Sequence, residues 1–398
     1  MVRTRSKVLV LTVAAALTLG AVVAGGAGAA AKPKGEPVKI GVIYTGGVAG
    51  LDNPTLQTGA VIAGKYLNAS GGGIAGRPVE IVSCNDKGDP AVDATCAQKF
   101  VDAGVVAVTG LGPAWGDNGL PITGAAGIPF VGLPISNAEF IDPSSYPITG
   151  GSAAAFPALA QYFINKKVKT ASILYADLAA GKLAADALLG DPMKAAGITV
   201  TEVPEKVGAP DFTASVVKAT EGDPDVLFIL FGSVDCARIA QAASQVGVKS
   251  ALAGAGSCAE DAKFSKVDKS IVEGAVFNSD TVWYQPKDKQ TKVYLSALKK
   301  YAKGEQPSSF SATTFATVLT LKTIGDGLGA NLSAATILDA LKNASGIPVF
   351  MATELNKDEP ALLAGIPTHI YNTDQRIIKL KNGKFVDANN NQWISGFK

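Results

Sequence analysis

The residue types that carry most enzyme chemistry are scarce in this chain, which contains one histidine and four cysteines. His369 lies in a strand-like C-terminal segment, and we interpret it as a structural residue. A serine hydrolase would need that histidine beside a nucleophile in a Gly-x-Ser-x-Gly turn, and the sequence contains no such turn. A glycosidase, which uses a pair of carboxylates, stays an alternative, because the separation of two carboxylates cannot be read from a sequence. We therefore expect a binding protein rather than an enzyme.

The glycine-rich turns do not fit a nucleotide site. The stretch from Gly254 to Ala259 formally matches Gly-x-Gly-x-x-Ala after a strand, but it comes late in the chain. Gly110, Gly112 and Gly116 follow another strand with the wrong spacing for this motif. A zinc site would need closely spaced cysteines or several histidines, and neither occurs. We expect no cofactor and no metal ion.

An export signal precedes the first expected strand. The first seven residues carry three positive charges, an apolar run follows, and small residues around Ala29 to Ala31 provide cleavage sites. We predict that residues 1–31 are a signal peptide and that the protein is secreted or periplasmic, with an uncleaved anchor helix as the alternative. No cysteine lies near the cleavage site, so we expect no lipid anchor. The remaining chain has 33 Lys and Arg against 34 Asp and Glu, which gives no electrostatic signal of a nucleic-acid partner.

The four cysteines of an exported chain are expected to form disulfides. Three pairings are possible, and we favour the two local ones, Cys84 with Cys96 and Cys236 with Cys258. Each member of these pairs lies at or near the end of an expected strand or in the helix that follows it. Each disulfide would stabilise the fold by about 3 kcal/mol on the chain-entropy model.

The elements that must position any site follow an α/β pattern. Short apolar runs rich in β-branched residues indicate buried parallel strands, and segments with helical spacing separate them. The same alternation begins again after residue 150, so about 367 residues form two units of similar size. The expected strands are 38–44, 78–82, 105–110, 128–133, 170–176, 198–203, 225–232 and 250–255.

From Gln290 the chain becomes mostly helical, and these helices have no strands of their own. They must therefore pack on the earlier sheets, so neither lobe is continuous in sequence. The predicted lobes are 38–150 plus 279–347 and 151–278 plus 348–398, joined by about three crossover segments. Such an arrangement is suited to hinge closure over a ligand.

The stretch NASGGGIAGRPVEIVSCNDKGDP (Asn68 to Pro90) resembles a family signature, N-x-x-G-G-I-x-G-R-P-(I/V)-E-(L/I)-V-x-x-D-D-x-x-D-P. That signature belongs to the branched-chain amino acid-type solute-binding proteins, and the resemblance continues through 89–110, 125–139 and 239–256. It implies an α/β, type I periplasmic-binding fold with two doubly wound parallel-sheet lobes. It also implies a monomer that captures a small-molecule ligand for ABC permease and ATPase subunits. The two local disulfides look like those of secreted relatives.

The resemblance implies a carboxylate site on the first lobe. Ser136 matches the family position whose hydroxyl and neighbouring backbone hold the ligand carboxylate, with a helix N-cap as its alternative role. Residues 112–114 stand where many relatives carry a serine-rich loop, so backbone N–H groups would have to replace the missing hydroxyls. Trp115 is expected either to stack on an apolar ligand or to pack in the core. The first-lobe ligand residues predicted in this way are Gly112, Pro113, Ala114, Trp115, Pro134, Ile135 and Ser136.

The second lobe departs from the family pattern. Relatives that bind α-amino acids place an acid just after the strand that matches SALAGAG, and this acid pairs with the ligand ammonium. This chain has Gly256 there. Because an unpaired buried ammonium is costly, another acid would have to replace it. The possible replacements, each of which could instead be a solvated loop acid or a cap, are Asp177, Asp235, Glu260 and Asp261. The second-lobe ligand residues predicted are Asp177, Ser233 and Gly256.

Together these features predict an extracytoplasmic protein that closes over a small hydrophobic amino acid or a related carboxylate and delivers it to an ABC importer. Aromatic carboxylates or amides are the alternative ligands. A ligand-sensing receptor subunit is the alternative function, because such a subunit can use the same two lobes.

Overall fold

The computed structural model describes residues 32–397 except 261–263, 265, 266 and 364. The predicted signal peptide, residues 1–31, lies outside the described residues. Within the described part of the chain, no helix combines the length and apolarity needed to cross a bilayer. The strands are β1 (Val38–Tyr44), β2 (Val79–Asn85), β3 (Val108–Gly110), β4 (Thr170–Ala176), β5 (Thr199–Glu205), β6 (Val226–Leu230), β7 (Ala251–Gly254), β8 (Val276–Ser279), β9 (Ser345–Pro348), β10 (Glu354–Asn356), β11 (Leu362–Leu363), β12 (Ile366–Pro367), β13 (Arg376–Lys381) and β14 (Lys384–Asp387).

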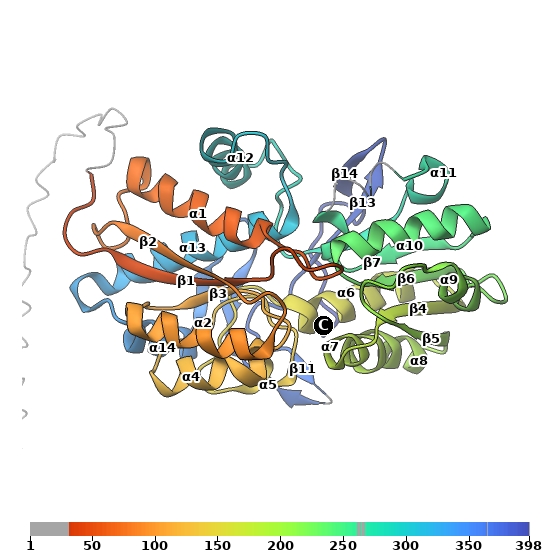
Figure 1. Ribbon diagram of the computed structural model, residues 1–398, viewed down its shortest axis with the longest axis horizontal. Helices are drawn as coiled ribbons and strands as arrows, with labels where there is room; N and C mark the ends of the chain where they lie inside the picture. Colours follow the sequence, from red (N-terminus) through yellow and green to blue (C-terminus); the bar gives the residue numbers. More distant parts are fainter. Residues whose placement is uncertain (1–31, 261–263, 265–266, 364, 398) are drawn as a thin grey trace, which may run out of the picture.

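The helices divide between two lobes that lie side by side (Figure 1). They are α1 (Thr55–Tyr66), α2 (Pro90–Ala103), α3 (Trp115–Asn118), α4 (Leu120–Ala125), α5 (Asn137–Ile141), α6 (Gly151–Asn165), α7 (Ala179–Leu183), α8 (Asp191–Ala195), α9 (Thr213–Ala219), α10 (Ser233–Val246), α11 (Lys269–Val272), α12 (Lys289–Tyr301), α13 (Ser309–Leu328) and α14 (Ala334–Lys342). A π-helical segment, η2 (Ala184–Gly190), joins α7 to α8, and a 3-10 turn, η3 (Gly256–Glu260), follows β7.

The first lobe is built on a parallel sheet in the order β2-β1-β3, with helices on both faces. Alternate residues of β1 face opposite sides: Val38, Ile40 and Val42 join the apolar cluster of α1 and α13, while Ile43 packs against Phe100 of α2. This two-sided burial explains why β1 reads as a nearly continuous apolar run.

Residues 128–133 were predicted to be a strand, and the structure forms only bridges there. The Val131 and Leu133 N–H groups donate to Val108 O and Gly110 O, so the segment does run beside β3. Within this segment, Phe130 makes two isolated parallel bridges, one to Val108 and one to Ser145. Proline at 129 and 134 supplies no N–H group, which limits a regular ladder.

The second lobe contains a seven-stranded sheet in the order β14-β13-β8-β7-β6-β4-β5. Strands β4 to β8 are parallel, and β13 adds antiparallel to β8. Strands β13 and β14 form a hairpin and pair through a turn at Asn382 and Gly383. Both turn residues have positive φ, 51° and 72°, as an Asn-Gly hairpin turn requires.

The C-terminal helices pack on the first lobe, as their lack of strand partners predicted. Helix α13 lies along α1, and the hairpin of β9 and β10 contacts α13. The hairpin of β9 and β10 therefore lies against the first lobe. The chain crosses between the lobes before α6, after β8 and before β13, so neither lobe is continuous (Figure 1).

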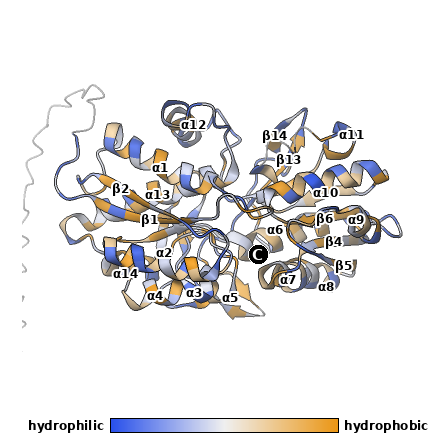
Figure 2. Cartoon of the chain, viewed as in Figure 1, coloured by the Kyte–Doolittle hydropathy of each residue, from blue (hydrophilic) through white to orange (hydrophobic). Residues whose placement is uncertain are grey.

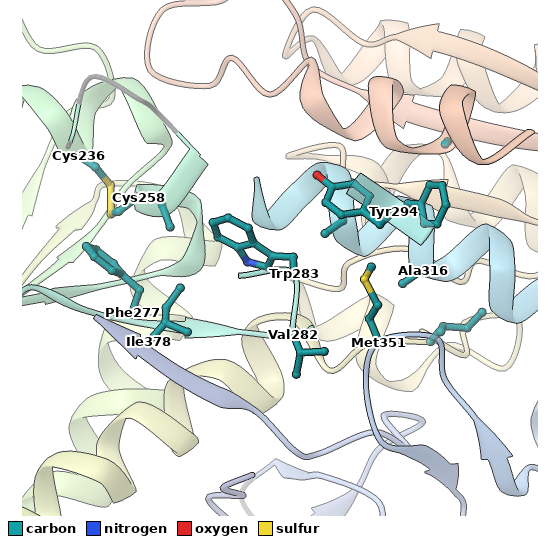
Figure 3. Packing of buried hydrophobic residues seen from close by; sticks show 14 of the residues in the cluster. Cys236, Cys258, Phe277, Val282, Trp283, Tyr294, Ala316, Met351 and Ile378 are labelled. Atoms are coloured by element: carbon teal, nitrogen blue, oxygen red, sulfur yellow. A yellow bond between two sulfur atoms is a disulfide. The ribbon is translucent and has the colours of Figure 1, made fainter. Parts of the chain in front are cut away.

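Both predicted disulfides are confirmed, with S–S distances of 2.05 Å for Cys84–Cys96 and 2.01 Å for Cys236–Cys258. One buried cluster continues from the second disulfide through the crossover residues Val282 and Trp283 to Tyr294 (Figure 3). Hydrophilic and hydrophobic residues alternate in bands along α10 (Figure 2). The lobes are therefore coupled through packed side chains at the crossover as well as through the chain itself.

Candidate ligand-binding site

A cavity of about 450 Å³ lies between the two lobes, and we call it the interlobe cavity. It opens where the parallel strands of both sheets end, which is the usual ligand position in open α/β sheets. Its volume lies within the range of small-molecule sites. Residues that follow or end five of these strands line it: Leu111 after β3, Ala176 of β4, Leu230 of β6, Ala255 after β7 and Asp280 after β8.

Contacts between the lobes surround the interlobe cavity. The loop after β1 reaches the second lobe, since a Cβ on Gly50 would lie 2.8 Å from Gly208 N. Across from it, the Glu260 carboxylate accepts hydrogen bonds from Thr55 Oγ1 at 2.9 Å and from Phe310 N at 2.5 Å. Burial raises the pKa of Glu260 to about 7.

Most of the lining is apolar. Both lobes contribute aliphatic and aromatic side chains, and α7 places only small residues against the cavity. A ligand that fills this space must therefore present an apolar body. The apolar side chains of the lining include Leu51, Leu111, Leu133, Ile135, Phe156, Leu178, Leu230, Phe231 and Phe310.

The sequence-predicted ligand residues divide into two groups. The interlobe cavity is lined by Pro113, Ala114, Ile135, Ser233 and Gly256. Outside its lining lie Gly112, Trp115, Pro134, Ser136 and Asp177.

Trp115 packs in the core of the first lobe. Its side chain is fully buried, and its ring centroid lies 6.0 Å from that of Phe100 and 6.2 Å from that of Phe130. Of the two roles expected for this residue, the structure favours packing.

Ser136 is the N-cap of α5. Its hydroxyl accepts from Glu139 N at 3.3 Å, and Glu139 Oε2 accepts in return from Ser136 N at 2.9 Å and from Ile135 N at 2.7 Å. This is a complete capping box. The backbone donors that the resemblance assigns to a ligand carboxylate are therefore occupied by a carboxylate of the protein itself.

The loop after β3 is also short of free backbone donors. Leu111 N donates to Ile43 O at 3.1 Å, and Trp115 N donates to Gly112 O at 3.1 Å. Ala114 N donates to the Asp93 carboxyl. Pro113 has no N–H group.

Three buried carboxyl groups, those of Asp86, Asp93 and Glu139, lie behind this part of the wall. A Cβ on Gly112 would lie 2.8 Å from both Asp86 Oδ2 and Asp93 Oδ1, so the two aspartates meet directly behind the loop. Burial and, next, the charge of Asp86 raise the pKa of Asp93 to about 7. Burial raises the pKa of Glu139 to about 7 and also raises that of Asp86. A ligand anion would have to approach this acidic wall.

Of the acids considered as replacements for the family's ammonium partner, the three that the structure describes do not line the interlobe cavity. Asp177 is exposed. Asp235 is buried, but it accepts from Gly208 N at 2.7 Å and forms an ion pair with Arg238 at 3.0 Å. Glu260 bonds across the lobes, as described above, and Asp261 lies outside the described residues.

Two other acids line the described part of the cavity, Asp52 and Asp280, and the sequence reasoning missed both; Asp280 is the buried one. Its side chain is 7% exposed and follows the last residue of β8. Gln375 Nε2 donates to Asp280 Oδ1 at 2.9 Å, Asn278 Nδ2 donates to Gln375 Oε1 at 3.2 Å, and Gly256 N donates to Asn278 Oδ1 at 2.8 Å. Burial raises the pKa of Asp280 to about 6. Asn278 and Ser279 separate Asp280 from the short apolar run before it, and the segment was interpreted as a crossover rather than a strand.

His369 has the structural position that its context suggested. Its Nδ1 atom lies 2.9 Å from Asp142 O, and its ring stacks on Tyr146 with centroids 4.6 Å apart. The Gly254 to Ala259 stretch forms the end of β7 and the turn η3, which carries a disulfide cysteine.

The family model for periplasmic binding proteins matches residues 37–361. No curated protein matches the chain at a significant level.

Solved structures of similar fold cover nearly the whole chain. A leucine binding protein, LivK, from Thermotoga maritima is 19% identical over 90% of this chain and 99% of its own, with a TM-score of 0.72. A substrate-binding periplasmic protein from Ralstonia solanacearum is 17% identical over 89% of this chain and 100% of its own, with a TM-score of 0.76. The branched-chain amino acid transporter substrate binding protein LivJ from Streptococcus pneumoniae, in complex with isoleucine, is 18% identical over 90% of this chain and 100% of its own, with a TM-score of 0.70. At these identities the likeness shows the fold, which is the predicted type I periplasmic-binding fold.

Proposed function

Because this chain belongs to the periplasmic binding protein family, we propose that it is the substrate-binding protein of an ABC importer and captures a small hydrophobic molecule between its lobes. Membership of the family implies an extracytoplasmic location, which suits two disulfides. Cleavage of residues 1–31 and delivery to permease and ATPase subunits are parts of this proposal.

The interlobe cavity is the observation that carries the proposal. Its walls come from both lobes, and the chain crosses between the lobes three times, as described above. A ligand that contacts both walls favours the closed arrangement, because it gains contacts there that the open arrangement cannot offer. Capture of this kind needs no covalent chemistry.

The test uses residues 32–398 with disulfides intact, freed of bound ligand by unfolding and refolding. Thermal unfolding is measured with a panel of hydrophobic amino acids, amines, carboxylates and amides. A ligand at a thousandfold its dissociation constant stabilises by about 4 kcal/mol, which moves the midpoint by several degrees. X-ray scattering with each stabilising compound then reports whether the protein becomes more compact.

Two variants test whether the ligand-induced shift of the unfolding midpoint comes from binding in the cavity. Ala180 lines it, whereas Ala187 is exposed on η2 and does not. We expect Ala180→Trp to abolish the ligand shift by filling the cavity and Ala187→Trp to retain it. The absence of any stabilising compound, or a shift that survives Ala180→Trp, would contradict capture at this site.

A further inference from the structure

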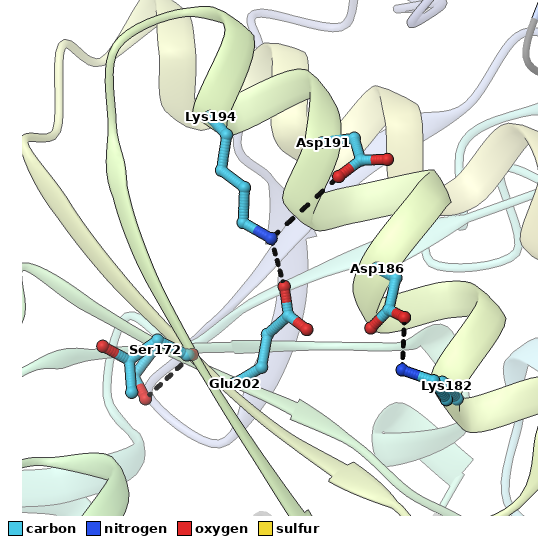
Figure 4. Close-up of polar contacts among 7 residues, drawn as sticks. Ser172, Lys182, Asp186, Asp191, Lys194 and Glu202 are labelled. Carbon is cyan, nitrogen blue, oxygen red and sulfur yellow. Dashed lines mark hydrogen bonds and ion pairs between the residues drawn. The ribbon is translucent and has the colours of Figure 1, made fainter.

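The interlobe cavity has an unbalanced charge. Among the described residues that line it, the ionisable side chains are Asp52 and Asp280, and none is a Lys, Arg or His. Lys182 follows the lining residue Gly181, but its Nζ atom lies 2.5 Å from Asp186 Oδ2 (Figure 4). The described lining therefore offers a ligand negative charge and no positive side chain.

Asp280 has hydrogen-bond donors, and the described part of the chain gives it no cationic partner. Gln375 and the backbone N–H of Gly151 donate to it, and both are neutral. Arg376 is the neighbour of Gln375 in the chain, but its guanidinium stacks over Trp393 at 4.4 Å from the ring centroid. A carboxylate can accept about four hydrogen bonds, so Asp280 keeps acceptor capacity toward the cavity. A buried carboxylate without a counter-charge is costly, and a bound cation removes that cost.

The carboxylate at 280 also explains the glycine at 256. A Cβ on Gly256 would lie 2.9 Å from Asn278 O, a backbone atom of β8, so an acid at 256 requires that strand to move. Instead, Gly256 N donates to Asn278, and the side chains of Asn278 and Gln375 continue the hydrogen bonds to Asp280. These buried amides fix the donor face of Gln375 toward the carboxylate. The negative group is thus held at the end of β8 rather than in the turn after β7.

The opposite wall does not offer an anion site. The backbone donors of Ile135 and Ser136 are taken by Glu139, and Ala114 N is taken by Asp93, as described above. A ligand carboxylate would lose its hydration without finding free donors on this wall, and it would face buried acids.

We propose that the interlobe cavity selects a small apolar amine, whose ammonium group pairs with Asp280, and that a ligand carboxylate is not required. The proposal rests on the proposed function, because it assigns the substrate class of the same cavity. It departs from the amino acid or carboxylate expected from the sequence, because the described lining supplies a negative side chain for an ammonium and no positive side chain for a carboxylate.

The experiment compares probes that differ in one charged group. One set is phenylalanine, 2-phenylethylamine and 3-phenylpropanoate, and the other is leucine, 3-methylbutylamine and 4-methylpentanoate. Dissociation constants are measured by calorimetry on refolded residues 32–398 at pH 7.5. We expect an amine to bind at least as tightly as the amino acid of its set, and the two carboxylates to bind at least tenfold more weakly than the amines.

Two variants locate the charge. Asp280→Asn keeps the shape and removes the charge, and we expect it to weaken amine binding at least about thirtyfold, as for loss of one partner of a buried charge pair. Asp191→Asn removes the same charge from an exposed site on α8 of the same lobe and should leave binding unchanged. If Asp280→Asn does not fold, the comparison of amines with carboxylates on the unchanged protein still decides the proposal.

Carboxylates that bind as tightly as the amines would overturn the proposal, as would amine binding that survives Asp280→Asn in a folded protein. If none of the six probes binds at 10 mM, the proposal is also overturned for this ligand class. In each of these cases, stabilisation and compaction with another compound of the wider panel would leave the proposed function standing. Failure of that whole panel would instead refute the function itself.

Discussion

Asp93 should make the protein lose stability as the pH rises from about 4 to about 7. Its carboxyl is 1% exposed, and its pKa is raised from 3.8 to about 7 by burial and, next, by the charge of Asp86. In the unfolded chain the same carboxyl ionises near its ordinary value of about 3.9. Between those two pH values the folded protein therefore holds a proton that the unfolded chain has released. The stability that this proton provides is full below the unfolded pKa and is lost as the pH rises through the folded pKa.

The magnitude follows from the number of protons. One extra proton in the folded state lowers the free energy of unfolding by about 1.4 kcal/mol for each pH unit within this window. Asp93→Asn keeps the shape of the side chain and can still donate to Asp86, but it cannot ionise. The variant should therefore lose less stability with rising pH, and its slope should be shallower than that of the unchanged protein by about 1.4 kcal/mol per pH unit. Glu139 and Glu260 also have a pKa raised to about 7, and they titrate in both proteins.

Urea unfolding at half-unit steps between pH 4.5 and 7.0 measures both slopes. Asp102→Asn is the control, because Asp102 is an exposed acid on the same helix, α2. Its slope should match that of the unchanged protein. Equal slopes for Asp93→Asn and the unchanged protein would show that Asp93 ionises at its ordinary pH and that the carboxyl pair behind Gly112 does not share a proton.

Two further changes test other parts of the structure. Ser136→Ala removes the cap of α5 and should lower the free energy of unfolding, measured in urea, by about 1 kcal/mol. Calorimetry should show ligand affinity unchanged within twofold, and tenfold weaker binding would show that Ser136 contacts the ligand. Replacing both Cys236 and Cys258 by serine opens a link between residues 22 positions apart and should cost about 3 kcal/mol of unfolding free energy; a loss below 1 kcal/mol in the same assay would contradict the chain-entropy account.

Local signals predicted most of the secondary structure. Helix α2 (Pro90–Ala103) has local signals at both ends, because Asp89 caps it, Pro90 suits its first turn and Gly104 ends it in the left-handed conformation with φ 66°. The capping box of α5 was readable in the same way, since Ser136 and Glu139 have the spacing that defines it. The resemblance gave that serine two possible roles, and only the hydrogen bonds of Glu139 decide between them.

The acid at 280 shows why the site was harder to predict than the elements around it. Asp280 accepts a hydrogen bond from Gln375, which is 95 positions away in the chain. The pairing of β13 with β8 brings the two residues together. No pattern within a window of sequence contains that contact. Position matching to a family also fails here, because it searches for the acid in the turn where Gly256 stands, and a side chain there would collide with the backbone of β8. What the fold preserves is the edge at which strand ends converge, so a charge lost from the end of one strand can be supplied from the end of its neighbour.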